Sequence, residues 1–260
     1  MVNPAHYSEV ITYLQKDLTI PIKYREFLAG EVFNHTARYD SLIANYYNRV
    51  NEVEFPKQLT ISYPLSKRCR YGENPHQNGA IYGDFLNYFD VLHGKELSYN
   101  NIMDISSACE LMLEFTSPTL AIIKHTNPCG VASADNFVEA FNLAFATDTI
   151  SPYGGIITIN GTVDGDLAKA IHSMFTEVII GTAFSDEALL ILKQKKDRRL
   201  VVADYEAIRK VNSDQNTKMF RSIPGGLLYQ DVDDQLMSGE LRTVTERNPT
   251  DEDIAKMLFA

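Results

Sequence analysis

The chain has 260 residues, of which 45% are apolar and 22% are charged, and its formal net charge is −10. This length allows one large domain or two small ones, and the apolar fraction is sufficient for a buried core. The acidic charge argues against nonspecific nucleic-acid binding, although a few local cations are enough to bind a small anion. The lack of an apolar run of ~18 residues argues against a membrane span.

The three cysteines, Cys69, Cys109 and Cys129, are widely spaced and odd in number. This arrangement is neither a disulfide framework nor the paired Cys-x-x-Cys pattern of a zinc site. No basic segment followed by an apolar stretch begins the chain, so no signal peptide is expected. The sequence therefore predicts a protein of the reducing cytoplasm, with no metal site in this segment.

The first 50 residues are predicted to be helical. Asn3 is a typical N-cap residue, and Pro4 follows it at the first helical position. From Tyr24 to Tyr47 the apolar side chains recur near helical spacing.

Residues 51–70 are expected to form an irregular linker. Proline follows an aromatic residue twice in this stretch, at Phe55-Pro56 and at Tyr63-Pro64, and proline disfavours regular structure. One short strand is expected between them, at residues 59–62. The stretch is the best candidate for a domain boundary.

After residue 100, short apolar runs alternate with segments of helical period. Strands are predicted at residues 120–123, 155–159, 178–180 and 200–202. Helices are predicted at residues 104–115, 135–146 with Asp135 as the cap, 167–175, and 185–193 with Ser185 as the cap. This alternation predicts a parallel or mixed sheet covered by helices on both faces.

The end of the chain carries a capping box, Thr250 and Asp253, followed by a helix that is still apolar at Ala260. Natural termini more often end in polar residues. One interpretation is therefore that the chain is a fragment, and the alternative is a terminal helix docked on the core.

A first polar cluster occupies residues 68–77, with Arg68, Arg70, Tyr71 and His76. Glycine and proline within it prevent a regular helix. Such a loop can present a guanidinium group to phosphate or carboxylate. The alternative is a polar surface turn, since most polar loops face solvent.

A second cluster, Lys124–Gly130, follows an apolar strand that ends at Lys124. Ligands of α/β sheets bind at the carboxyl ends of strands. His125 suits general-base chemistry, and the adjacent Lys124 favours the neutral imidazole and can hold an anionic substrate. Asn127-Pro128 with Gly130 is expected to form a turn. A purely structural histidine remains the alternative.

Two further features are weaker. Cys129 is either a nucleophile or a passive small residue, because no paired base can be identified. Residues 151–155, Ser-Pro-Tyr-Gly-Gly, lie before a predicted strand. Their adjacent glycines allow a ligand to approach the backbone closely, or simply form a turn.

Taken together and in order, these motifs resemble one family. The family is bifunctional and joins an inosine monophosphate (IMP) cyclohydrolase to an aminoimidazole carboxamide ribonucleotide (AICAR) formyltransferase. The similarity lies in four runs: Arg-Tyr-Gly-Glu-Asn-Pro-His-Gln at 70–77, Leu-Ser-Tyr-Asn-Asn at 97–101, Lys-His-Thr-Asn-Pro-Cys-Gly at 124–130 and Tyr-Gly-Gly-Ile-Ile at 153–157. Residues 224–231 and 240–245 are also similar. The resemblance covers nearly the whole chain.

The resemblance implies formyl transfer from 10-formyltetrahydrofolate to the 5-amino group of AICAR, followed in the full-length protein by cyclisation to IMP. The matching catalytic residues are His125, as proton acceptor, and Lys124. Residues matching the nucleotide site, or near it, are Arg70, Tyr71, His76, Gly154 and Glu177.

The resemblance also implies an organisation. Residues 1–55 match the closing helices of the cyclohydrolase domain, and residues 56–260 match the first half of the formyltransferase domain. The implied fold is α/β: a three-layer α/β/α lobe similar to the cytidine deaminase fold, with an N-terminal helical remnant. The implied assembly is a homodimer with the active site at the interface, so the isolated chain is expected to be nearly inactive. Rival interpretations are a catalytically silent nucleotide-binding fragment and a contribution to the cyclohydrolase alone.

Overall fold

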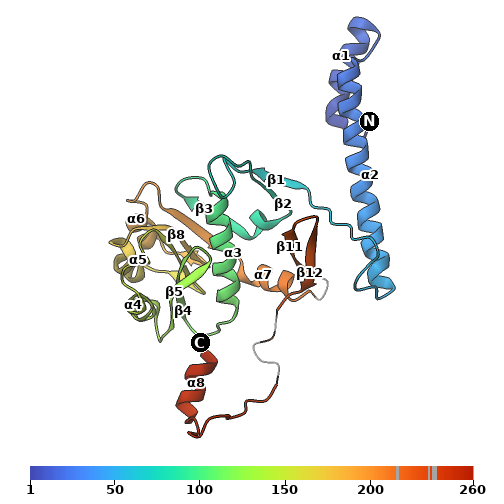
Figure 1. Ribbon diagram of the computed structural model, residues 1–260. Coiled ribbons are helices and arrows are strands. Elements are labelled where there is room, and N and C mark those ends of the chain that lie inside the picture. The colour runs from blue at the N-terminus through green and yellow to red at the C-terminus, as the bar shows by residue number, and fades with distance from the viewer. Residues whose placement is uncertain (215–216, 234, 236–238, 260) are drawn as a thin grey trace. The chain divides into compact units, whose positions relative to one another are not determined.

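The computed structural model describes residues 1–214, 217–233, 235 and 239–259 (Figure 1). The chain divides into two units, Met1–Ala203 and Asp204–Ala260. Ala260, which ends the predicted formyltransferase segment, lies outside the described residues. Among the described helices, none is both long enough and apolar enough to cross a membrane.

The first unit begins with two helices, α1 (Tyr7–Asp17) and α2 (Ile22–Val50). They confirm the helical prediction for the first 50 residues. A short 3-10 turn (Pro4–His6) precedes α1, and Asn3 caps it by accepting a backbone N–H over 3.0 Å.

The strand predicted at residues 59–62 is wrong. The Thr60 carbonyl accepts a hydrogen bond from the Asn45 side chain over 3.1 Å instead of joining a ladder. The first strand, β1 (Leu65–Arg68), starts only after the second proline and pairs with β2 (Ala80–Tyr82). A run of strand-forming residues without a neighbouring strand has no partner for its backbone groups.

The first unit contains a six-stranded mixed sheet in the order β3-β10-β8-β6-β4-β5. Its strands are β3 (Phe89–His93), β4 (Thr119–Lys124), β5 (Asn127–Ser133), β6 (Gly155–Ile159), β8 (Thr176–Gly181) and β10 (Arg199–Ala203). Strand β8 is parallel to β6 and β10, whereas β4 is antiparallel to β5 and β6, and β3 to β10. The four strands predicted after residue 100 and the mixed sheet are thereby confirmed.

Four helices connect these strands: α3 (Tyr99–Leu113), α4 (Phe137–Thr147), α5 (Gly165–His172) and α6 (Asp186–Leu192). The four predicted helices are confirmed; Ser185 caps α6 as predicted, and the other three starts are shifted. Helix α3 begins at Tyr99 because Ser98 and Asn101 form a reciprocal capping box. Helix α4 is capped by Asn136, not by Asp135. Two small elements also occur here, a 3-10 turn (Phe85–Tyr88) and the pair β7 (Thr162–Val163) and β9 (Ala183–Phe184).

Helices cover both faces of the sheet. Successive strand residues point to opposite faces. One set packs with buried residues of α4, α5 and α6, and includes Leu120, Ile122, Ile157, Ile159 and Ile179. The alternate set is equally buried, and includes Ala121, Ile123, Ile156 and Ile180. Helix α3 contacts β4 and β6 and covers this second face.

The turn predicted at Asn127-Pro128 with Gly130 is wrong, because the chain reverses two residues earlier. Lys124 pairs with Asn127, so that His125 and Thr126 form the turn of the β4–β5 hairpin. Gly130 lies within β5, where it allows close packing on α4. A Cβ atom at this position would lie 2.0 Å from the carbonyl oxygen of Ala144.

The second unit contains helix α7 (Tyr205–Asn212), the hairpin of β11 (Lys218–Ile223) and β12 (Gly226–Asp231), and helix α8 (Asp251–Phe259). The predicted capping box of α8 is confirmed. The Asp253 N–H donates to Thr250 Oγ1 over 3.1 Å, and the Thr250 N–H donates to Asp253 Oδ2 over 3.0 Å. The hairpin was not predicted; Gly225, with φ of 78°, lies in its turn.

Candidate functional site

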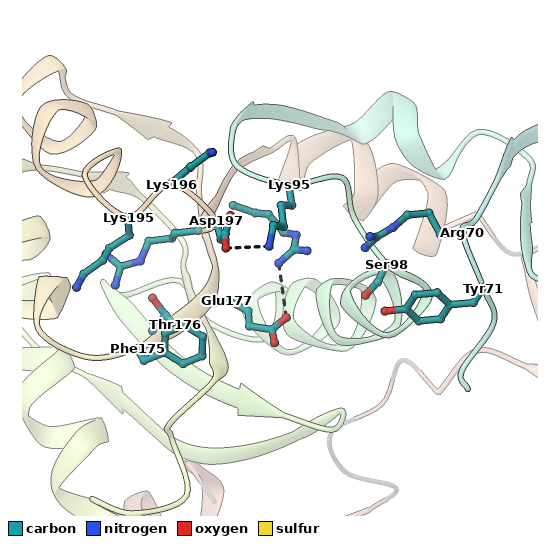
Figure 2. Close-up of a pocket in the computed structure, with 12 residues that line it drawn as sticks. Arg70, Tyr71, Lys95, Ser98, Phe175, Thr176, Glu177, Lys195, Lys196 and Asp197 are labelled. Atoms are coloured by element: carbon teal, nitrogen blue, oxygen red, sulfur yellow. Dashed lines mark hydrogen bonds and ion pairs between the residues drawn. The ribbon is translucent and has the colours of Figure 1, made fainter. Parts of the chain in front are cut away.

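Three of the predicted site residues line one cavity of about 500 Å³ in the first unit (Figure 2). Arg70 and Tyr71 lie in the loop that follows β1, and Glu177 lies on β8. The remaining lining residues are Lys95, Ser98, Phe175, Thr176 and residues 195–199. The cavity therefore combines segments from four separate parts of the chain.

The cavity is rich in positive charge although the whole chain is acidic. Its cationic side chains are Arg70, Lys95, Lys195, Lys196, Arg198 and Arg199, and its acidic ones are Glu177 and Asp197. Asp197 is paired with Lys95 over 2.8 Å, and this ion pair lowers the pKa of Asp197. The surplus of cations suits an anionic ligand such as a phosphate.

Glu177 is held in the cavity wall from two directions. Asn101 Nδ2 donates to Glu177 Oε2 over 3.0 Å, and Arg199 Nη1 lies 3.6 Å from the same oxygen. Burial lowers the pKa of Arg199 while the Glu177 charge raises it. Arg199 also donates to the Glu96 carbonyl through Nε and Nη2, so its guanidinium group has a fixed orientation.

The loop that carries Arg70 is closed by its own hydrogen bonds. The Gly72 N–H donates to the Gln77 carbonyl over 2.7 Å, and the Asn74 N–H donates to the Gln77 side chain over 2.8 Å. The Arg70 guanidinium group lies 5.6 Å from the centre of the Tyr71 ring, a cation–π contact. His76 is exposed in this loop and does not line the cavity.

His125 lies outside the cavity lining, in a strained turn. The φ angles are 54° at His125 and 63° at Thr126, and this left-handed conformation costs about 1–3 kcal/mol for a residue other than glycine. Strain of this kind concentrates at functional sites. The Thr126 N–H donates to Asp104 Oδ1 on α3 over 2.8 Å. Helix α3 thus bonds both to Glu177 of the cavity wall, through Asn101, and to the His125 turn, through Asp104.

Lys124 is held by the third predicted cluster. Its Nζ donates to the carbonyl of Tyr153 over 2.9 Å and to that of Ser151 over 3.2 Å. Gly154, with φ of 78°, donates its N–H to the Phe175 carbonyl over 2.8 Å. Because Phe175 lines the cavity, these bonds connect Lys124 and Gly154 to its wall.

The remaining candidate, Cys129, is half-buried. Burial and the Asp148 charge raise the pKa of its thiol, although Lys124 opposes them. A raised pKa keeps the thiol protonated, which favours the passive role over the nucleophilic one.

The residues that sequence reasoning missed are Asn101, Asp104 and Arg199. Each is buried or half-buried and contacts a predicted site residue or its turn. Arg199 had a usable signal, because an arginine directly precedes an apolar strand. Within the described ranges, no group of three or more His, Cys, Asp or Glu side chains could hold a metal ion.

Comparison with known proteins gives one consistent result. The model of the AICARFT/IMPCHase bienzyme family matches residues 1–260. The bifunctional purine biosynthesis protein PurH of Chloroflexus aurantiacus is 44% identical over 264 residues, which cover 100% of this chain and 50% of that protein. PurH of Bacillus subtilis is 40% identical over 263 residues, covering 97% of this chain and 50% of that protein. The chain thus spans about half the length of these relatives.

Proposed function

This chain belongs to the AICARFT/IMPCHase bienzyme family, and we propose from that membership that it contributes to AICAR formyl transfer in de novo purine biosynthesis. In the full-length protein the formylated product is then cyclised to IMP. The observation that carries the proposal is the convergence of Arg70, Tyr71 and Glu177 on one cationic cavity. Arg70 and Tyr71 are neighbours in the sequence, whereas Glu177 lies on the distant strand β8, and the fold brings all three to the same cavity.

In the proposed reaction, the 5-amino group of AICAR attacks the formyl carbon of 10-formyltetrahydrofolate. A new C–N bond forms and the carbonyl oxygen gains negative charge. Collapse of this intermediate breaks the bond to N10 of the folate, which leaves as tetrahydrofolate after taking up a proton. The amine is a weak nucleophile because its lone pair is delocalised, so a base is required.

We assign that base to His125, which takes the proton of the attacking amine. Lys124 assists through its positive charge beside the developing oxyanion. Its two bonds to the Ser151 and Tyr153 carbonyls fix the ammonium group against the loop before β6. The strained His125 turn supports the assignment, because such conformations are retained where function requires them.

The nucleotide is proposed to occupy the cationic cavity. Arg70 suits its phosphate, because a guanidinium group can donate two parallel hydrogen bonds. Tyr71 and Glu177 suit hydroxyl or ring groups of the nucleotide. Gly154 and His76 are the remaining proposed nucleotide-site residues. The hydrogen bond from the Gly154 N–H to the Phe175 carbonyl supports the inclusion of Gly154.

The wider organisation is also proposed. Residues 1–55 correspond to the end of the cyclohydrolase domain, and residues 56–260 to part of the formyltransferase domain. The sheet with helices on both faces agrees with a cytidine deaminase-like lobe. We further propose a cytoplasmic homodimer with the active site at the interface, with folate as co-substrate and no metal bound by this segment.

The test has two parts: AICAR binding by this chain, measured by calorimetry, and formyl transfer by an active preparation, measured by tetrahydrofolate release. AICAR is expected to bind, and Arg70→Ala is expected to weaken binding at least about tenfold. Lys57→Ala, in the linker, is the control and should leave binding unchanged. Absence of AICAR binding would overturn the proposal. If AICAR binds but no preparation transfers the formyl group, and His125→Ala changes only the affinity for AICAR, the chain is instead a silent nucleotide-binding module.

A further inference from the structure

The turn that presents His125 is unfavourable for its own residues. Two consecutive non-glycine residues, His125 and Thr126, have positive φ angles of 54° and 63°. Two-residue hairpin turns of this kind favour Asn-Gly, and a β-branched residue such as threonine is poorly suited to the left-handed region. The conformation therefore has to be held by interactions beyond the preferences of the two residues.

Three hydrogen bonds hold the turn. Thr126 Oγ1 donates to the His125 carbonyl over 2.7 Å, and Asn127 Nδ2 donates to the same oxygen over 2.9 Å. The third joins the turn to a different element, because the Thr126 N–H donates to Asp104 Oδ1 over 2.8 Å. Of the three, only this bond connects the turn to helix α3.

Asp104 also interacts electrostatically with the imidazole. The carboxylate is half-buried, and burial raises its pKa. The Thr126 N–H and the His125 charge act in the opposite direction, while Glu177 on β8 raises the pKa further. The groups facing Asp104 are thus the Thr126 amide and His125 from the turn and Glu177 from the sheet.

We propose that Asp104 is the positioning residue of the His125 base. Its carboxylate fixes the left-handed turn through the Thr126 amide and thereby orients the His125 ring. Asp104 itself neither touches the substrate nor takes the proton. This inference rests on the proposed role of His125, and it adds a residue that the sequence motifs did not identify.

Two measurements on this chain need no turnover. Carbon-13 NMR of Asp104 is compared between wild type and His125→Asn, which keeps a residue suited to positive φ and removes the titrating ring. The pKa of Asp104 is expected to rise in the variant, because the His125 charge that lowers it is lost. His172→Asn is the control and should leave Asp104 unchanged. An unaltered Asp104 titration in His125→Asn would overturn the electrostatic interaction of Asp104 with the imidazole.

The second measurement is hydrogen exchange of the Thr126 amide. Asp104→Ala removes the acceptor and is expected to accelerate exchange at least about tenfold, whereas Asp104→Asn keeps an acceptor oxygen and changes exchange little. Glu110→Gln, an exposed carboxylate on the same helix, is the matched control. Equal exchange in wild type and Asp104→Ala would overturn the positioning part.

The third measurement is the rate of formyl transfer in an active preparation. Asp104→Ala is expected to lower kcat about 10- to 100-fold, within the range of general-base catalysis, with the KM for AICAR nearly unchanged. Asp104→Asn, which keeps an acceptor oxygen for the Thr126 amide, is expected to restore most of the rate. A kcat of Asp104→Ala equal to that of wild type would overturn the proposal. If wild type transfers no formyl group at any pH, the proposed function fails, and the two NMR measurements still decide the role of Asp104.

Discussion

Arg199 Nη1 lies 3.6 Å from Glu177 Oε2, and the two residues occupy neighbouring parallel strands, β10 and β8. The arginine side chain is only 9% exposed, whereas the glutamate side chain is 44% exposed. The carboxylate therefore faces the cavity while it compensates a nearly buried positive charge. The Arg199–Glu177 pair thus balances a buried charge in the sheet and places a carboxylate at the proposed nucleotide site.

Removing the negative charge from this pair should destabilise the first unit. Glu177→Gln leaves Arg199 without its counter-charge, and the expected loss is about 1–2 kcal/mol, reduced from the cost of a fully buried pair because Glu177 is partly exposed. Urea unfolding measures it. Glu187→Gln is the control, because its pair with Lys169 is exposed on both sides and should contribute less than about 1 kcal/mol. Equal losses in the two variants would contradict the special role of Glu177.

Lys124→Met should loosen the loop of residues 148–155 and slow formyl transfer. The variant keeps the length of the side chain but loses the bonds to the Ser151 and Tyr153 carbonyls. The Gly154 amide, which bonds to Phe175, is expected to exchange faster by NMR, and formyl transfer by an active preparation should fall at least about tenfold. Lys169→Met, on an exposed helix surface, is the control. Unchanged exchange at Gly154 would show that the loop holds without Lys124.

The same loop should respond to acid. Hydrogen bonds from the Ser151 side chain and from the Ser151 and Ile150 amides lower the pKa of Asp148 below its ordinary value of 3.8. A carboxyl group with a depressed pKa adds stability that is present above the ordinary value and is lost as the pH falls through the lower, folded-state value. Amide exchange at Ile150 and Ser151, corrected for intrinsic rates, should therefore rise only below about pH 4. In Asp148→Asn this acid step should be absent, and its persistence would assign the step to another group.

Two glycines should respond in opposite ways to alanine. At Gly130 the added Cβ would lie 2.0 Å from the Ala144 carbonyl and 2.4 Å from Thr147 Oγ1. Backbone must shift there, so Gly130→Ala is expected to cost about 1–3 kcal/mol or more. At Gly30, within α2, nothing lies within 4 Å of the added atom, and alanine should stabilise the helix by about 0.5–1 kcal/mol. Thermal unfolding followed by circular dichroism separates the two, and a stabilised Gly130→Ala would contradict the packing of β5 on α4.

The sequence alone predicted the elements whose signals are local. The strand at 155–159 and the N-cap at Ser185 agree with the structure, because apolar periodicity and capping depend on neighbouring residues. Predictions failed where the structure of a segment depends on contacts with residues far away in the sequence. Residues 59–62 have strand-forming side chains but no partner strand, and Gly130 was assigned to a turn although α4 requires it within β5.

The candidate site divides in the same way. Arg70, Tyr71, Lys124 and His125 could be named from the sequence because their chemistry and ordered motifs are visible there. Only the tertiary structure decided that Arg70 and Tyr71 share a cavity with Glu177, that Asn101 and Arg199 hold Glu177 in place, and that Asp104 reaches the His125 turn. The physical reason is that hydrogen bonds, ion pairs and left-handed turns between distant segments are stabilised by the folded sheet, and no local sequence signal records which side chains that sheet brings together.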